Sequence, residues 1–319
     1  MDEMAMIWPS EEITSSWPTP PLPFPAPPSI VGSIGNGGGK MRAAFTILVL
    51  VTLSLLGLGQ TAAELVSQAD AIFQEVWQSE YTPDTHEALQ SRLQEAIALY
   101  EQALEVGGED ADVLAMLSRC YYMLADIFLP QDEKARTHIQ GQEYGERALR
   151  ADPEFVARER DQDFVEAARA HTHLEALYWT YANWARKVDL GAQGGLLGAV
   201  FRGDDKKLRA MMERCLELDP NYLAGGPYRA MGAYWAKHPL GKDPERAREL
   251  FQAAREAFPG YLENTYFLVQ YYLVPQKQWE EAAQLLEEII AAPLGDWPLQ
   301  NSVVKLRAQE LLLEVQEHL

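Results

Sequence analysis

The sequence has little cysteine and little positive charge, and these shortages exclude several classes of protein. Only two cysteines occur among 319 residues, Cys120 and Cys215, so the chain is not a small scaffold held together by disulfides. Both lie in helical patterns, where we expect buried free thiols, with a single disulfide as the alternative. The formal net charge is −20. Because nucleic-acid-binding proteins need a basic face, we expect no nucleic-acid partner.

Motifs for catalysis, nucleotides and metals are also missing. The glycines before Lys40 resemble a phosphate-binding loop only loosely, because Ile34 and Met41 replace the required glycine and serine or threonine. In the segment HTHLEALYW, only His171 and Glu175 share a helical face, and two ligands make a poor metal site. No serine or cysteine has a candidate base nearby in the sequence. We therefore expect no enzyme, no cofactor and no metal.

The start of the chain is predicted to be leader sequence. Residues 1–40 hold eight of the 19 prolines and end in GNGGGK, a composition that favours extended, solvated chain over a packed core. Met41 stands where a signal peptide would begin. We interpret residues 1–40 as a disordered leader or as an over-extended gene start.

The next segment, residues 41–63, has the layout of a secretory signal peptide. Arg42 provides a basic flank, an apolar run follows, and small residues precede a cleavage site after Ala63. The alternative is a retained membrane anchor, because no charged residue interrupts the segment from position 43 onward. We expect residues 64–319 to fold outside the cytoplasm.

Almost everything after residue 64 follows a helical pattern. Apolar residues recur at spacings of three and four, which places them on one helical face; the first such run consists of Leu89, Leu93, Ala96, Ile97, Tyr100, Ala103 and Leu104. No segment alternates convincingly as a strand does. The sequence predicts an all-α protein.

A helical repeat is visible in GGPYRAMGAYWAKHPLGKDPERARELF, which starts at Gly225. The tetratricopeptide pattern pairs a first helix, W-x2-L-G-x2-Y, with a second helix, A-x3-F, and a closing proline. The first-helix positions are Tyr228, Met231, Gly232 and Trp235, and the second-helix positions are Ala247, Phe251, Ala254 and Pro259. We expect Gly232 and Ala254 to let the paired helices approach closely.

The second-helix pattern occurs five times. Its starts at 96, 141, 208, 247 and 282 are separated by 45, 67, 39 and 35 residues, whereas a regular array repeats every 34 or so. The remaining positions are Tyr100 and Ala103; Gly145, Ala148 and Pro153; Met212, Cys215 and Pro220; Leu286 and Ile289. The sequence therefore predicts an irregular tetratricopeptide-like helix-pair solenoid with insertions, which in solenoids usually mark the binding face.

Two further segments are unusual. LEALYWTYANWARKVDL concentrates four aromatic residues on one helix, Tyr178, Trp179, Tyr181 and Trp184; it is either a buried central helix or the wall of a cavity. GAQGGLLGAVFRGDDKK follows it, and an apolar, glycine-rich loop is costly to order in water. We interpret this loop as a core plug, a subunit contact or a lip over a ligand site.

Three segments together resemble one known family. ALYWTYANWARKVDL, the run from MMERCLELDPNY to AFPGY, and NSVVKLRAQELL span most of residues 170–313. They are similar to the tetratricopeptide-repeat T component of tripartite ATP-independent periplasmic (TRAP) transporters. Lys242 stands where a second glycine is commoner in that family. The lipid-bearing cysteine of some members is absent, which puts a membrane anchor in doubt.

The resemblance implies a periplasmic, non-enzymatic accessory protein. It would partner a solute-binding P component, form a homotrimer, and hold a small organic ligand in an internal cavity. First helices line the concave side of tetratricopeptide superhelices, so we predict that the ligand lies nearest Tyr178, Trp179, Trp184, Tyr228, Arg229 and Trp235. An arginine can grip a carboxylate through two parallel hydrogen bonds; the alternative for Arg229 is an ion pair with a surface acid. The alternative function is a general periplasmic scaffold that binds peptide segments of a partner.

Overall fold

The computed structural model describes residues 59–319, and this part of the chain is built from helices and turns without a strand. The helices are α2 (Ala62–Trp77), α3 (His86–Gly107), α4 (Ala111–Met123), α5 (Gln131–Arg150), α6 (Pro153–Asp161), α7 (Phe164–Ala170), α8 (Leu174–Asp189), α9 (Gly195–Arg202), α10 (Asp204–Leu218), α11 (Tyr222–Lys237), α12 (Pro244–Ala257), α13 (Glu263–Leu268), α14 (Trp279–Ala291) and α15 (Pro298–Gln316). Two π-helical turns, Leu124–Phe128 and Val269–Leu273, extend α4 and α13. The predicted all-α class is confirmed.

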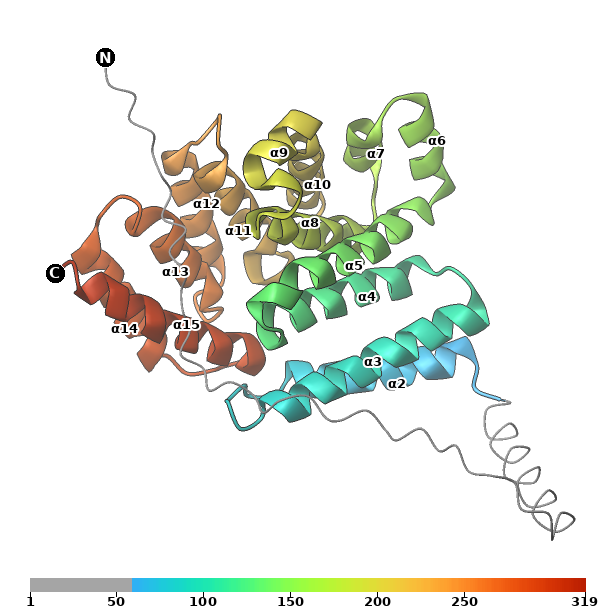
Figure 1. Cartoon of the computed structure of the whole chain (residues 1–319), viewed down its shortest axis with the longest axis horizontal. Coiled ribbons are helices and arrows are strands. Elements are labelled where there is room, and N and C mark those ends of the chain that lie inside the picture. The colour runs from blue at the N-terminus through green and yellow to red at the C-terminus, as the bar shows by residue number, and fades with distance from the viewer. Residues whose placement is uncertain (1–58) are drawn as a thin grey trace, which may run out of the picture. The chain divides into compact units, whose positions relative to one another are not determined.

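The helices are arranged as neighbouring pairs. Helix α2 packs along α3, α4 along α5, and α11 along α12 (Figure 1). Helix α10 packs against α8, α14 contacts α13 and its π-helical turn, and α15 packs against α14. The five predicted second helices are α3, α5, α10, α12 and α14. The long interval between the second and third holds three additional short helices, α6, α7 and α9, so the predicted irregular helix-pair solenoid is confirmed.

Small residues lie where the paired helices approach most closely. A Cβ atom on Gly232 of α11 would lie 2.4 Å from the Phe251 ring of α12, and Ala254 is fully buried in the same pair. Gly145 of α5 would meet Thr180 of α8 at 2.3 Å. The predicted packing roles of Gly232 and Ala254 are therefore confirmed.

The turn between α11 and α12 shows why its sequence is HPLGKDP. The carboxylate of Asp243 accepts a hydrogen bond from the backbone N–H of Arg246, and Pro244 occupies the first turn of α12. A side-chain acceptor before the helix and a proline at its first position both favour a helix start. The backbone N–H of Asp243 also donates to the carbonyl of Trp235 at 3.0 Å, which ties the turn back to α11.

The predicted leader lies outside the described residues, as does most of the predicted signal peptide. The described part begins just before Thr61, whose side chain caps α2 together with Glu64 in a capping box. Cleavage after Ala63 would remove this cap. Within residues 59–319 no helix is long and apolar enough to cross a membrane. Cys120 and Cys215 are buried and unbonded, as the first of the two expectations stated.

Candidate ligand cavity

A cavity of about 330 Å³ opens among the first helices of four consecutive pairs. This size falls in the range of small-molecule sites. One face of each helix lines it: Tyr122 and Asp126 from α4 and its π-helical turn; Tyr178, Tyr181, Ala182, Ala185, Arg186, Val188 and Asp189 from α8; Arg229, Ala230, Ala233, Tyr234 and Lys237 from α11; Glu263, Tyr266, Phe267, Gln270 and Tyr271 from α13 and its π-helical turn. The first helices thus surround a common space.

Both π-helical turns contribute to this wall. Asp126 comes from the turn that extends α4, and Gln270 and Tyr271 come from the turn that extends α13. A π-helical turn inserts one extra residue into a helix and re-aims its side chains, and such turns are frequent at functional sites. The cavity therefore lies where two helices depart from regular geometry.

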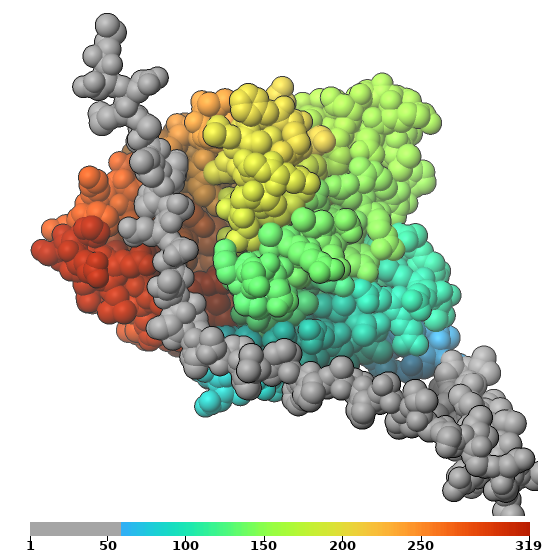
Figure 2. Space-filling view, in the orientation of Figure 1, coloured from blue at the N-terminus to red at the C-terminus, as the bar shows by residue number. Residues whose placement is uncertain are grey.

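The glycine-rich segment borders the same cavity through helix α9. Leu196, Ala199 and Val200 line the cavity, while Leu197 and Phe201 of the same helix are 55% and 87% exposed. In the space-filling view, the yellow segment of α9 and α10 lies at the surface (Figure 2). Gly191, Gly194 and Gly203 beside α9, and Gly195 at its start, adopt positive φ angles, a conformation that other residues rarely adopt. The loop therefore borders the cavity and also packs on the core through Ala199; that it forms a lip over a ligand site stays a prediction.

The charged residues of the cavity wall fall into pairs and one larger cluster. Lys237 is paired with Asp189, Arg229 with Glu263 at 3.2 Å, and the His238 ring with Asp205 at 3.6 Å. Each acid in these pairs has one basic partner, an arginine, a lysine or a histidine.

The larger cluster is centred on Asp126. Its carboxylate accepts hydrogen bonds from Arg186 at 2.6 Å and from Arg307 of α15 at 2.9 Å, and Lys134 of α5 donates to its backbone carbonyl at 3.3 Å. Burial alone would raise the pKa of the Asp126 carboxyl, but the two guanidinium groups outweigh burial and hold this pKa well below its usual range. Asp126 is therefore ionised at neutral pH.

A smaller cavity of about 60 Å³ adjoins the first one. Both are lined by Tyr122, Asp126, Tyr178, Glu263 and Arg307. The Asp126–Arg307 ion pair therefore forms part of the partition between the two cavities.

Arg229, the predicted carboxylate-binding residue, lies at the cavity wall but is only 2% exposed. Its guanidinium donates to the carbonyls of Ala224 at 2.8 Å and Leu223 at 3.1 Å, and to the Asn264 side chain at 2.6 Å. It also lies over the Tyr261 ring at 4.5 Å. Arg229 does form the ion pair that the alternative proposed, with Glu263 at 3.2 Å, but from a buried position, and two of its three hydrogen bonds go to backbone carbonyls.

The backbone that Arg229 holds is strained. Leu223, Ala224 and Gly225 have φ angles of 47°, 52° and 82° before α11 becomes regular. Two consecutive non-glycine residues in the left-handed region are unfavourable unless the surroundings hold them. Arg229 and Asn264 provide that support through the carbonyl oxygens of the bend.

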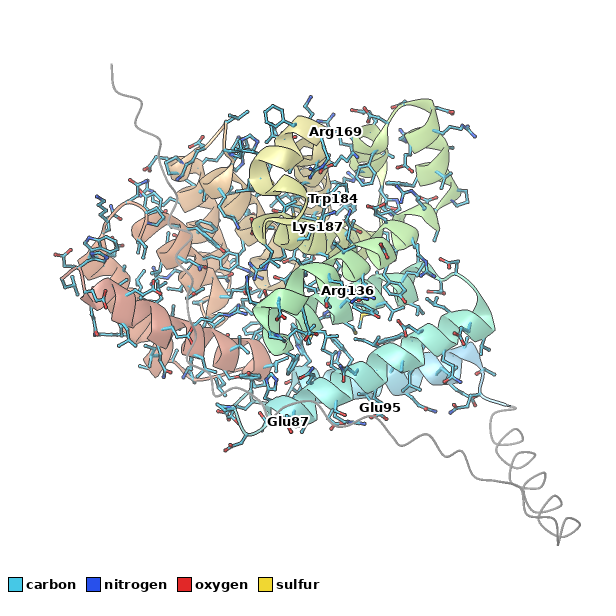
Figure 3. The ribbon with its side chains drawn as sticks, in the orientation of Figure 1. Glu87, Glu95, Arg136, Arg169, Trp184 and Lys187 are labelled. Carbon is cyan, nitrogen blue, oxygen red and sulfur yellow. The ribbon has the colours of Figure 1, made fainter. Side chains whose placement is uncertain are left out.

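The other predicted residues separate into two groups. Tyr178 lines both cavities, and Trp179 lines the smaller one. Trp184, Tyr228 and Trp235 line neither. Trp184 packs on the ammonium of Lys187 one turn further along α8, at 5.2 Å (Figure 3), and the guanidinium groups of Arg209 and Arg246 pack against the Trp235 ring.

The sequence interpretation missed the charged cluster at Asp126. Arg307 lies 181 residues from Asp126 in the sequence, and Asp126, Lys134 and Arg307 come from three different helical elements. Arg186 had a usable signal, because it follows Tyr178 and Ala182 at intervals of four residues on the cavity face of α8.

Histidines near the start of α8 have structural partners. His171 is 5% exposed and meets the Phe155 ring edge-on at 5.3 Å. His173 caps α8 by accepting a hydrogen bond from the backbone N–H of Ala176. Among residues 59–319 no group of three or more histidine, cysteine, aspartate or glutamate side chains is arranged to hold a metal ion.

Comparison with known proteins identifies one family. The family model for the TRAP transporter T-component matches residues 86–318. No curated protein matches the chain. Among solved structures, the yeast Tom70 crystal structure is similar over 82% of this chain, at 14% sequence identity and a TM-score of 0.31. This chain spans 65% of that structure, so it covers less than two thirds of its length.

Proposed function

The chain belongs to the TRAP transporter T-component family, and on this premise we propose that it is a periplasmic accessory protein of a TRAP system that holds a small amphiphilic ligand in its central cavity. The observation that carries the ligand proposal is the makeup of the cavity wall. Aliphatic and aromatic side chains such as Val188, Leu208 and Phe267 line the same cavity as the charged cluster at Asp126. Pockets of this composition suit an apolar body with one polar head.

The ligand proposal is tested by filling the cavity. Ala233 is a small residue of the wall, 9% exposed, on the cavity face of α11. Ala233→Trp would place an indole in the cavity. We expect decanoate, a medium-chain carboxylate, to bind the parent in isothermal titration calorimetry and to lose binding in this variant. The matched control is Ala257→Trp, an exposed alanine of α12. Equal binding by the parent and Ala233→Trp would contradict the proposal.

We propose that the solute-binding P component docks around the mouth of this cavity. Leu197 and Phe201 of α9 and Leu240 after α11 are strongly exposed, and their neighbours Leu196, Val200 and Pro239 line the cavity. Exposed apolar side chains gathered at one place mark interaction surfaces. A partner that delivers or receives the ligand has to contact the mouth. The P component is therefore the expected partner of this surface.

The docking proposal is tested with the solute-binding P component of a TRAP system from the same organism. Phe201→Ser and Leu240→Ser should weaken its binding in surface plasmon resonance, whereas Leu313→Ser should not. Leu313 is the matched control because it is 67% exposed on α15 and does not line the cavity. A Leu313→Ser variant that loses binding while Phe201→Ser retains it would place the P component elsewhere.

The alternative, a scaffold that grips peptide segments, would use an open groove along the first helices. In residues 59–319 that space is bordered by α9, and ion pairs at Asp126, Asp189 and Glu263 join neighbouring first helices along its wall. These features favour a small ligand over an extended peptide. The homotrimer and the export by residues 41–63 remain proposals drawn from the family and from the sequence.

A further inference from the structure

The charges of the cavity are unevenly distributed. Three of its ion pairs contain one acid and one cationic or histidine partner. At Asp126, one carboxylate faces two arginines, and the Lys134 ammonium lies against the same residue. The surplus positive charge of the wall is therefore concentrated at this one place, in a chain whose formal net charge is −20.

The surplus positive charge around Asp126 comes from several helices, not from one. Lys134 comes from α5, Arg186 from α8, Arg307 from α15 and Asp126 from the π-helical turn after α4. Burying cationic groups without compensating anions costs free energy. Three cationic groups beside a single carboxylate on a cavity wall therefore call for a further anion.

Two groups of this cluster have hydrogen-bonding capacity left. Lys134 makes a single hydrogen bond within the described part of the chain, to the Asp126 carbonyl, although an ammonium has three N–H donors. The Nε atom of Arg186 is buried without a hydrogen-bond partner among residues 59–319. Unpartnered buried donors are rare in native proteins and call for an explanation.

We propose that Lys134 and Arg186, backed by Arg307, bind the carboxylate headgroup of the ligand, with Asp126 as the resident counter-ion that holds the three cationic groups in place. This inference rests on the proposed ligand function and adds the position of the headgroup and the sign of its charge. The tail would then extend along Val188, Leu208 and Phe267. Neutral and cationic amphiphiles of the same length are excluded as preferred ligands, because neither compensates the surplus charge.

Lys134 is the most suitable residue to substitute, because it contributes little to the stability of the fold. It is only partly buried, and no carboxylate of the described residues lies within ion-pair distance of it. Burial lowers the pKa of Lys134, and the two neighbouring guanidinium groups lower it further against the opposing effect of Asp126. A bound carboxylate relieves this unfavourable environment.

The experiment compares three probes with the same ten-carbon tail: decanoate, decanol and decyltrimethylammonium. Isothermal titration calorimetry is run on the parent, Lys134→Gln, Arg186→Gln and the control Lys277→Gln, which alters an exposed lysine that does not line the cavity. We expect the parent to bind decanoate more tightly than the other two probes. Lys134→Gln should lower the affinity for decanoate about tenfold, because it removes one charge-assisted hydrogen bond. Decanol affinity should be the same in the parent, Lys134→Gln and Lys277→Gln.

The outcomes separate the two proposals. If decanol and decanoate bind the parent equally and Lys134→Gln leaves both unchanged, the headgroup assignment is overturned while the ligand cavity stands. If no probe binds the parent, the ligand function fails and the headgroup assignment fails with it. If Lys134→Gln loses affinity for decanoate but keeps its affinity for decanol, and Lys277→Gln keeps both, the headgroup assignment is supported. This holds even if Arg186→Gln proves too unstable to study.

Discussion

Gly226 of α11 lies directly against the ring of Tyr178 of α8, and a Cβ atom on Gly226 would be 2.6 Å from the Tyr178 hydroxyl oxygen. This contact joins the Gly-Gly-Pro segment to the aromatic helix at the cavity wall. The glycine is required because no larger residue leaves room for the ring.

Gly226→Ala should therefore disturb both the fold and the cavity. Overpacking a well-filled site costs about 1–3 kcal/mol, and the displaced Tyr178 ring would move relative to the ligand. Urea denaturation and decanoate titration provide the two measurements. Gly260→Ala is the control, because a Cβ there would meet Trp297 at an ordinary 3.6 Å. Equal stability of the two variants would show that the contact is looser than described.

Close packing of α11 on α12 gives a second prediction. Gly232→Leu and Ala254→Leu should each destabilise the protein by about 1–3 kcal/mol, because Gly232 contacts the Phe251 ring and Ala254 is fully buried. Ala257→Leu, on the exposed side of the same helix, should change the free energy of unfolding very little. Unchanged melting temperatures in the first two variants would refute this helix pairing.

We expect the main effect of removing Arg229 to be a loss of stability of the fold, and any effect on ligand binding to be secondary to it. Arg229→Ala removes the donor to the Leu223 carbonyl and to Asn264 Oδ1, and leaves the Ala224 carbonyl with the Asn264 Nδ2 donor at 3.2 Å. We expect a loss of about 2–4 kcal/mol in the free energy of unfolding. The control, Arg160→Ala, removes a guanidinium whose side chain is 72% exposed and should cost less than about 0.5 kcal/mol. Similar losses in both variants would mean that the bend does not depend on Arg229.

The buried histidine His138 predicts a pH dependence. Burial lowers its pKa to about 4 from the usual 6.5, so below the usual value the unfolded chain binds a proton that the folded chain does not. Its contribution to stability is complete above about pH 6.5 and is lost as the pH falls from there towards 4, in total about 3 kcal/mol.

His138→Gln isolates this contribution, because glutamine keeps a donor for Asn183 Oδ1, which now lies 3.0 Å from His138 Nδ1. Chemical denaturation at pH 7 and pH 4.5 should show a smaller loss of stability in the variant than in the parent. The same acid-induced loss in both proteins would assign the pH dependence to other groups.

Helical periodicity was sufficient for much of the fold. Ala96, Ala247 and Ala282 marked second helices correctly, because small residues at helix seams recur with the repeat. The π-helical turns were beyond such reasoning, since the extra residue at Asp126 or Tyr271 shifts the helical register without a local sequence mark.

The site was predicted less well, for a geometric reason. Trp184 and Trp235 each follow a cavity residue, Tyr178 or Arg229, by six positions, which is about 240° around a helix of 3.6 residues per turn. Trp235 therefore points away from the wall, and Trp184 lies at its edge, next to Val188 and Tyr181. Asp126 and Lys134 were missed because their meeting with Arg307 depends on tertiary structure alone.

A crystal structure with 10-bromodecanoate tests the central claim most directly, because the anomalous signal of bromine locates the tail independently of the protein map. The account predicts a bromine peak inside the cavity between α8, α11 and α13, with the carboxylate beside Lys134 and Arg186. A bromine peak elsewhere on the protein, with the cavity free of ligand density at a saturating concentration, would contradict it.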